Sequence, residues 1–333
     1  MRVGIDTFTI RDLKLNPFET LDFIKKHDLE GAQFGGLRGL SENLDLGELK
    51  DVRQYADGLG LYSHVSTGTC NPHLLQGDLD AHRHAMEKEI QLAADCGWHE
   101  LHSSLGSGDE RYKHQVPWTR HLADSADFIR SLGPALRTHG SRINLETHGD
   151  TSTFELLRLI ENVGPDIAGI CLDTANVLCH AEDPVSAARR AAPYTHLTHT
   201  KDAIIFFVSG GYRRQTLPAG KGALDWGSIL PILAEYSPDL PISIEDHKWL
   251  FDFNVFDPAW LALNPDLTIE EFGRVCQIAF LCQGRINSGE LPEPDKYETI
   301  PFIDELEERL SCGRDYLKGT IRRLGLAPKQ SSS

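Results

Sequence analysis

The sequence lacks the features that mark membrane, disulfide-bonded and nucleic-acid-binding proteins. No window approaches about 18 uninterrupted apolar residues, so no membrane span is expected. The seven cysteines form no C-x-x-C pair, which favours small core thiols over bridges or ligands. The chain has 33 basic against 49 acidic residues, and its formal net charge of −16 makes DNA, RNA and anionic membranes poor partners.

The start of the sequence also lacks two kinds of signal. Met1 to Asp6 predicts a strand, without the basic and apolar segments of a signal peptide, so we expect a cytoplasmic protein. Neither G-x-G-x-x-G nor G-x-x-x-x-G-K-[ST] follows this strand. This absence weakens a doubly wound nucleotide-binding sheet, which is the second choice of fold.

What the sequence does contain is an alternation of strand and helix signals. Eight short strands are predicted, beginning near positions 2, 31, 60, 98, 141, 167, 194 and 240, and helical segments separate most of them. Strict alternation implies a parallel sheet with crossover helices. Eight such units in about 250 residues predict an α/β protein of the (β/α)8 TIM-barrel type.

The rest of the chain predicts a C-terminal helical extension. We divide the sequence into a catalytic barrel over 1–250, a helical extension over 251–328, and a disordered tail over 329–333. Helices are expected over 268–282 and 301–324, and the Ser-rich end has no means of forming a core.

Four consecutive strands are each expected to end in a carboxylate or an imidazole, at Glu146, Asp173, His199 and Glu245. The carboxyl ends of barrel strands share one rim, where three carboxylates would repel one another without a cation. Oxygen-rich ligation with one imidazole favours Mn²⁺, with Mg²⁺, Co²⁺ or Zn²⁺ as alternatives. Singly, each residue is better explained by a cap or a core hydrogen bond, so the joint pattern is what predicts one divalent metal ion.

The residues around these four positions resemble the xylose isomerase-like TIM-barrel family of sugar isomerases, epimerases, inosose dehydratases and related lyases. The resemblance covers about residues 1–247 and implies that the four residues hold the metal. The motifs that carry it are Leu145-Glu146-Thr147-His148, Leu172-Asp173-Thr174-Ala175-Asn176, His199-Thr200-Lys201-Asp202, Ile244-Glu245-Asp246 and Gly220-Lys221-Gly222-Ala223-Leu224-Asp225-Trp226.

One position departs from the epimerases of this family, which usually carry a His three residues after the metal-binding Asp. This chain has Asn176 there, which can hydrogen-bond a hydroxyl but cannot carry a proton. The resemblance therefore implies two outcomes. One is isomerisation or epimerisation after proton abstraction next to a carbonyl of a sugar or keto-sugar. The other is β-elimination, as in inosose dehydratases or in lyases that cleave 3-oxo-glycosides, C-glycosides among them.

The C-glycoside-cleaving relatives work with a smaller β-rich partner subunit. The resemblance thus implies an oligomer, or a complex in which the long C-terminal extension helps to bind such a subunit. The substrate expected on either branch is a small sugar or glycoside.

Three residues are candidates for the proton transfer. The resemblance implies that Glu146 and Glu245 flank the substrate on opposite sides. His148 shares a strand face with Glu146 and has an intrinsic pKa near neutrality, so it is a third candidate base. A purely structural His148 is the alternative.

The candidate substrate-binding residues are His102, Asn176, Lys201, Arg213 and Lys221. The segment from Ser209 to Gln215 is basic and glycine-hinged, so we predict a mobile lid there, with an ordinary loop as the alternative. If its two arginines bind a phosphate, the substrate is a sugar phosphate. Aromatic residues that follow Glu245, at 249, 251 and 253, are expected to line the site or to pack the extension.

Two other classes of function remain to be compared. An endonuclease IV-like repair enzyme shares this fold but needs several metals and a basic DNA-binding face, which the net charge opposes. A barrel used only for binding or scaffolding is the non-enzymatic alternative, and the complete ligand set argues against it.

Overall fold

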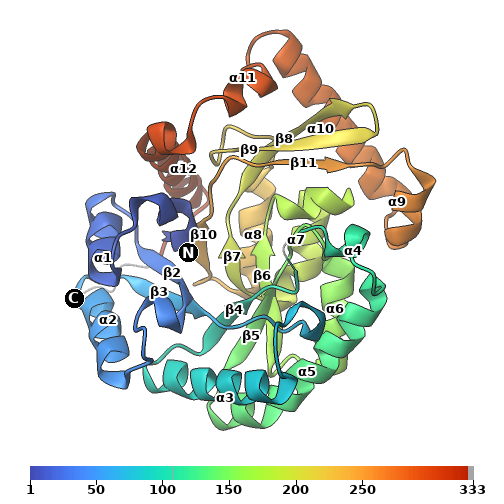
Figure 1. Cartoon of the computed structure of the whole chain (residues 1–333). Helices are drawn as coiled ribbons and strands as arrows, with labels where there is room; N and C mark the ends of the chain where they lie inside the picture. Colours follow the sequence, from blue (N-terminus) through green and yellow to red (C-terminus); the bar gives the residue numbers. More distant parts are fainter. Residues whose placement is uncertain (107, 329–333) are drawn as a thin grey trace.

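The computed structural model describes residues 1–106 and 108–328, and a closed parallel barrel lies at its centre (Figure 1). Its eight strands are hydrogen-bonded in the order β10-β1-β2-β3-β4-β5-β6-β7. A parallel bridge between Thr200 and Ile244 joins β7 to β10 and closes the ring. The strands are β1 (Arg2–Asp6), β2 (Gly31–Gly36), β3 (Tyr62–Ser66), β4 (Glu100–Ser103), β5 (Arg142–Glu146), β6 (Ala168–Asp173), β7 (Thr195–His199) and β10 (Pro241–Ile244). The predicted (β/α)8 barrel is confirmed.

Helices surround the barrel, as the crossover rule requires. The long helices that follow the strands are α1 (Pro17–Lys26), α2 (Leu46–Gly58), α3 (Leu79–Asp95), α5 (Trp118–Thr138), α6 (Thr153–Val163), α7 (Pro184–Ala191) and α8 (Trp226–Tyr236). Their starts are encoded locally: Asn16 caps α1 ahead of Pro17, and Ser152 forms a capping box with Glu155 on α6.

The C-terminal segment is helical, as predicted, and its last helix belongs to the ring around the barrel. It contains α9 (Pro258–Leu263), α10 (Ile269–Asn287), α11 (Pro294–Glu298) and α12 (Phe302–Arg323). Helix α12 packs on β1, β10 and α8, and Arg314 Nη1 donates to the His27 carbonyl at the end of α1, at 2.6 Å. The predicted boundary at residue 250 stays a prediction, but the outer ring is completed only by α12. The tail predicted to be disordered, 329–333, lies outside the described residues.

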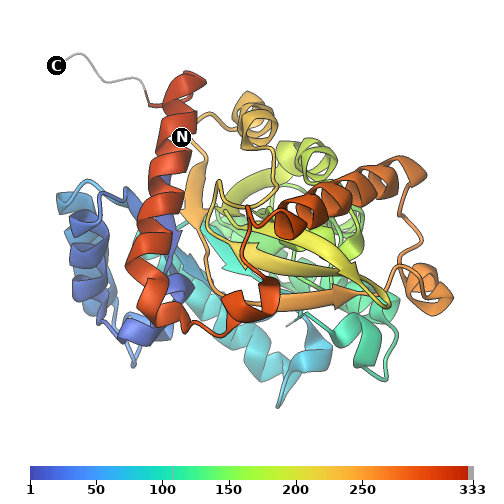
Figure 2. The same cartoon turned by 90° about the horizontal axis from the view of Figure 1, so that it is seen from above.

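A three-stranded antiparallel sheet stands beside the barrel and was not predicted. It has the order β11-β9-β8 and contains β8 (Asp202–Val208), β9 (Gly211–Leu217) and β11 (Leu250–Phe253). Figure 2 shows α10 lying across this sheet, where Cys282 joins Ile204, Phe206 and Leu217 in a small apolar cluster. The predicted loop over 209–215 is therefore wrong, because most of it is the paired strand β9, and a lid role for this hairpin stays a prediction.

Over the described residues, no helix combines the length and the apolar character needed to cross a bilayer.

Candidate active site

Four buried side chains converge at the carboxyl end of the barrel. Glu146, Asp173, His199 and Glu245 each offer one ligand atom, and these atoms all lie within 4.8 Å of one another. His199 Nδ1 lies 3.2 Å from Glu146 Oε1 and 3.0 Å from Glu245 Oε2. All four residues are at most 8% exposed. The structure thus brings the four predicted ligands together as an oxygen-rich set with one imidazole, which suits a divalent cation.

Within the part of the chain that the structure describes, several of the atoms that could ligate a metal ion make no hydrogen bond. Among the described residues, Asp173 Oδ2, His199 Nδ1 and Glu245 Oε2 are buried without an aligned hydrogen bond, although charged neighbours lie about 3 Å away. Leaving a buried polar atom in this state costs roughly 1–3 kcal/mol. The residues present therefore fit a metal ion to which all these atoms would donate.

Two cationic groups of the chain itself lie against the carboxylates. Lys201 Nζ is 2.8 Å from Asp173 Oδ2 and 3.1 Å from Glu245 Oε2. Burial lowers the pKa of Lys201, but these two carboxylates raise it by more, so the ammonium stays protonated. Burial also lowers the pKa of His199, yet neighbouring anionic groups such as Glu146 hold it well above its ordinary value. A metal requires neutral imidazole, so metal loading is expected to release this proton.

The three carboxyl groups differ in their response to this environment. Burial raises the pKa of Glu146, but His199, His148 and His102 together outweigh it, and the net pKa lies well below the ordinary value. The same holds for Glu245, where Lys201 and His199 outweigh burial. The pKa of Asp173 is raised, because burial and the two glutamates outweigh Lys201. Without a metal ion, Asp173 is thus the carboxyl group that binds a proton most readily.

Two residues that the sequence analysis did not single out support His199 from behind. His199 Nε2 lies 2.6 Å from the Gln33 side-chain amide and 3.4 Å from Asp6 Oδ2, while Nδ1 faces the glutamates. Such partners orient a ligand imidazole and determine which nitrogen meets the metal. The available signal was a polar side chain in the otherwise apolar strands β1 and β2, since a buried polar group needs a partner.

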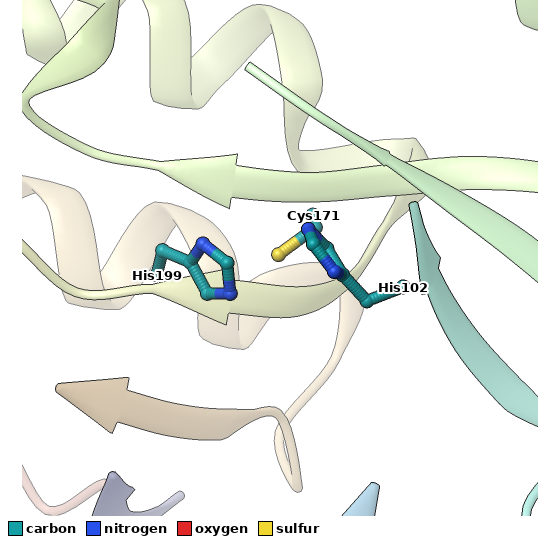
Figure 3. A group of neighbouring side chains, drawn as sticks. All are labelled: His102, Cys171 and His199. Atoms are coloured by element: carbon teal, nitrogen blue, oxygen red, sulfur yellow. The ribbon is translucent and has the colours of Figure 1, made fainter. Parts of the chain in front are cut away.

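A second group of possible ligands shares His199. It consists of His102, Cys171 and His199, and Figure 3 shows the Cys171 sulfur pointing toward the His199 ring. Burial raises the pKa of the Cys171 thiol to about 11, so little thiolate exists at neutral pH. Cys171 is two residues before Asp173 on β6 and so faces the same way, deeper in the barrel. Of the two groups, the carboxylate-rich one is therefore the better candidate to hold a divalent metal ion.

Glu146, His199 and Glu245 line a cavity of about 930 Å³, large enough for a sugar or a glycoside, whereas the fully buried Asp173 does not line it. One wall is aromatic: the Phe8 ring lies 5.6 Å from His247, which lies 6.0 Å from Trp249. The predicted site residues that line the cavity are His102, Glu146, His148, His199, Lys201 and Glu245.

Two of the three pocket histidines outside the ligand group, His102 and His148, have different surroundings. His102 is engaged on both nitrogens, with Nε2 3.1 Å from Glu146 Oε2 and Nδ1 2.9 Å from Ser66 Oγ. His148 is half-buried with its ring 6.2 Å from Trp249, and its Nδ1 has no hydrogen-bond partner in the described part of the chain. His102 thus orients a glutamate, whereas His148 is available for a proton.

The neighbouring arginines of β9 point to opposite sides of the strand, as strand geometry requires. Arg213 faces outward, where Nε lies 2.5 Å from Asp252 Oδ1, so this predicted substrate residue lies outside the cavity. Arg214 is fully buried, donates to the Asn176 side-chain oxygen, and lies 4.9 Å from the ring of Trp249. The Asn176 side-chain nitrogen lies 3.5 Å from Glu146 Oε1, so this pair contacts the ligand group from behind.

The motif from Gly220 to Trp226 holds the hairpin in place. The buried Asp202 carboxylate accepts hydrogen bonds from Gly220 N at 2.8 Å and from Trp226 Nε1 at 3.0 Å. A Cβ at Gly222 would lie 2.1 Å from Asp202 Oδ1, which explains a glycine at this position. Lys221 is exposed on this turn and does not line the cavity, so the structure does not bring this predicted substrate residue to the site.

Helix α12 contacts the chain next to the last ligand. Arg309 donates to both carboxylate oxygens of Asp246, with Nε 2.8 Å from Oδ2, and both side chains are almost fully buried. Lys248 Nζ pairs with Glu305 Oε2 at 2.6 Å. The position of Glu245 therefore depends on the C-terminal segment.

A family model described as "Xylose isomerase-like TIM barrel" matches residues 21–255. The chain belongs to this family. Among curated proteins, the xylose isomerase-like chain is similar to "Uncharacterized protein YihM" of Escherichia coli strain K12, with 23% identity over 230 residues. This match covers 68% of the chain and 64% of YihM.

Solved structures share the fold of this xylose isomerase-like chain at low identity. D-psicose 3-epimerase from Clostridium cellulolyticum H10 has a TM-score of 0.67 and 13% identity, over 96% of this chain and 99% of the epimerase. The probable 3-DHS dehydratase AsbF of Bacillus anthracis has a TM-score of 0.57 and 18% identity, over 80% of this chain and 97% of AsbF. These likenesses confirm the fold, and the neighbours include both an epimerase and a dehydratase.

Proposed function

We propose that the protein is a divalent-metal-dependent enzyme that removes a proton next to a carbonyl of a sugar or keto-sugar. The convergence of Glu146, Asp173, His199 and Glu245, with donor atoms unsatisfied at the base of a cavity, carries this proposal. The named epimerase among the structural neighbours supports a sugar as substrate. Mn²⁺ is the metal we favour for this oxygen-rich set, with Mg²⁺, Co²⁺ or Zn²⁺ as alternatives.

The residues of the chain divide the work of such a reaction. A bound divalent ion supplies Lewis-acid stabilisation of negative charge on the carbonyl oxygen. His148 accepts the proton from the neighbouring carbon, and the C–H electron pair moves toward the carbonyl, giving an enediolate. Lys201 and His102 are placed in the cavity to bind substrate oxygens. Return of the proton from His148 to the neighbouring carbon completes isomerisation. Epimerisation needs a proton delivered to the opposite face by a second group, for which Glu146 and Glu245 are the candidates.

Glu146 and Glu245 are the alternative pair of bases. They lie on either side of His199 Nδ1, at 3.2 and 3.0 Å, and their carboxyl pKa values are lowered despite burial, chiefly by His199 and by Lys201 respectively. A carboxylate with a low pKa is a weak base, which favours His148 for the proton and the two glutamates for the metal.

Elimination is the second candidate outcome, and the surroundings of Asn176 favour it. Its side chain is held between Arg214 and Glu146, where it is fully buried and does not line the cavity. It therefore does not take the place of the substrate-gripping His of the epimerases. In elimination, the enediolate electrons form a C=C bond and expel a β-substituent, as in a dehydratase or a lyase for 3-oxo-glycosides or C-glycosides.

Solvent-deuterium exchange tests the proton abstraction directly. Metal-loaded protein is incubated in D₂O with hexuloses, 3-oxo-glycosides and inososes, and deuterium in the recovered sugar is measured by NMR. Exchange supports the proposal, and an unsaturated product that has lost its β-substituent identifies elimination. No exchange and no product with any of the three classes would sink it. Metal content of Glu245→Gln, compared with wild type, tests the ligand set at the same time.

We also propose that the protein acts in the cytoplasm, as an oligomer or with a smaller β-rich partner subunit. All seven cysteines lie in the described part and are free thiols, which suits a reducing compartment such as the cytoplasm.

Exposed apolar residues on α10 support the proposed oligomer or partner. Ile269 and Phe280 are 91% and 72% exposed, and their spacing puts them on one face of the helix. Mass measurement on protein purified from its native source tests this, and a monomer without a partner would contradict it.

A further inference from the structure

Besides Lys248, which is paired with Glu305, three cationic side chains line the cavity and have no role in the proposed chemistry. Arg11 and Lys14 follow β1, and Arg38 follows β2; all three are exposed and line the cavity. We call these three residues the basic rim. Within the described ranges, none of them forms an ion pair with a carboxylate. Arg11 Nη1 donates instead to the Phe8 carbonyl at 2.6 Å, and Arg38 Nη1 donates to a backbone carbonyl.

The basic rim contrasts with the rest of this acidic chain. Many other surface arginines have nearby carboxylates, as in the pairs Arg53–Asp57 at 3.0 Å and Arg120–Asp124 at 2.7 Å. Within the described residues, the exposed Arg189, Arg322 and Arg323 also form no ion pair, but they lie on outer helices and do not line the cavity. The carboxylates that line the cavity, Asp6, Glu146 and Glu245, all lie within 3.4 Å of His199 at its base. The rim therefore has cations and no lining carboxylate, in a protein with 49 acidic and 33 basic residues.

A continuous wall connects the basic rim to the ligand group. The guanidinium carbon of Arg11 lies 3.9 Å from the centre of the Phe8 ring. Phe8 contacts His247 edge-on, and His247 Nε2 lies 3.7 Å from Glu245 Oε1. A ligand lying along this wall would reach the ligand group with one end and the rim with the other.

The rim also has free space beside it. Gly35, Gly36 and Gly39 line the same part of the cavity, and a Cβ added to any of them would meet nothing within 4 Å. Phosphate sites in TIM barrels often use the loops after strands 7 and 8. Here β7 leads directly into the hairpin of β8 and β9, and Lys248, which follows β10 and lines the cavity, is paired with Glu305. Among the described residues, the lining cations without a carboxylate partner are therefore those on the first two loops.

We propose that the basic rim binds an anionic substituent of the substrate, a phosphate or a carboxylate, at the end remote from the carbon that loses its proton. This rests on the proposed function and narrows its substrate to acidic or phosphorylated sugars. Arg11 and Arg38 supply planar N–H pairs for such an oxyanion, and Lys14 supplies a mobile charge.

Calorimetric binding to the metal-loaded full-length protein tests the proposal without turnover. The probes are D-fructose, D-fructose 6-phosphate and D-fructuronate, which share one frame and differ at C6, together with inorganic phosphate. At low salt, at least one charged sugar is expected to bind about tenfold or more tightly than D-fructose, and high salt should reduce this gain. The phosphate and carboxylate probes distinguish the two sources of the anion.

Two triple variants provide the decisive comparison. Arg11→Gln/Lys14→Gln/Arg38→Gln should lose the gain for charged sugars and should keep the metal. The matched control, Lys26→Gln/Lys50→Gln/Lys88→Gln, removes three exposed cations from the outer helices and should keep the gain. Equal affinity for all sugars, no binding of any anionic probe, or a gain that survives the rim variant would overturn the proposal. Rim-dependent binding without deuterium exchange would overturn the proposed reaction and not the rim.

Discussion

The two sides of the cavity are built in opposite ways. On the side of β5, β6, β7 and β10, charged groups are buried and lie about 3 Å from opposite charges, as Lys201 does from Asp173. On the side of β1 and β2, the basic rim is exposed and has no carboxylate partner among the described residues. A buried charge must be paired within the fold, whereas an exposed cation is stabilised by water and can await a ligand. Under the two proposals made above, the buried side carries the reaction and the exposed side selects the substrate.

The largest expected effect, on metal content and turnover, comes from replacing the proposed buried ligand Asp173. Asp173→Asn keeps the shape and removes a ligand charge, so bound metal should be lost and turnover should fall by more than about 100-fold, because even outer partners of a ligand are worth 10–100-fold. Elemental analysis and steady-state rates measure both. Asp51→Asn, on the exposed face of α2, is the control. Full metal content in Asp173→Asn would remove this residue from the ligand set.

A substitution at His148 tests whether metal binding and proton transfer depend on different residues. His148→Asn should keep the metal, because His148 is not among the four ligands, and should lose about 10²–10⁴-fold in rate if it is the base. Its affinity for charged sugars should not change, because the basic rim is intact. Turnover near that of wild type would assign His148 a structural role and return proton transfer to the two glutamates.

A substitution at Gln33 tests whether its hydrogen bond to His199 contributes to metal affinity. Gln33→Leu removes the amide 2.6 Å from His199 Nε2, so metal affinity should fall by about 10–100-fold. Competition with a chelator measures this change. Gln54→Leu on the outside of α2 should have no effect. Unchanged metal affinity in Gln33→Leu would show that Asp6 alone orients the ring.

The smallest expected effect is a pH dependence of stability at the edge of the buried side. Burial, aided by Glu110, raises the pKa of Asp150 from 3.8 to about 7. The neutral form therefore favours the fold: its contribution is fully present below pH 3.8 and is lost as the pH rises through about 7.

Asp150→Asn cannot ionise and should escape this loss. Its stability relative to wild type should improve between pH 4 and pH 8, by at most about 4 kcal/mol, at roughly 1.4 kcal/mol per pKa unit. Thermal unfolding at the two pH values measures the difference. A relative stability that is independent of pH would show that Asp150 titrates normally.

The sequence was sufficient to predict features that follow from local hydrophobic periodicity and from the rule that the carboxyl ends of barrel strands share one rim. Strand and helix alternation predicted the barrel, and the common rim of strand ends predicted that Glu146 and Glu245 would meet across 98 intervening residues. Features that depend on distant pairing were not predictable in this way. Strand β9 is recognisable only by its pairing with β8 and with β11, and this pairing decides that Arg214 faces inward and Arg213 outward. The role of Gln33 likewise depends on β7, which is far away in sequence.

The contact between Arg309 and Asp246 has a consequence for how the chain can be divided. Both charges are buried, and leaving one without its partner would cost about 3–5 kcal/mol. Helix α12 therefore stabilises the end of β10, next to Glu245, through the contact of Arg309 with Asp246. A barrel shortened at residue 250 would lose this contact together with the eighth outer helix. The candidate metal site and the C-terminal segment therefore form one structural unit, and the barrel is not expected to keep this site without α12.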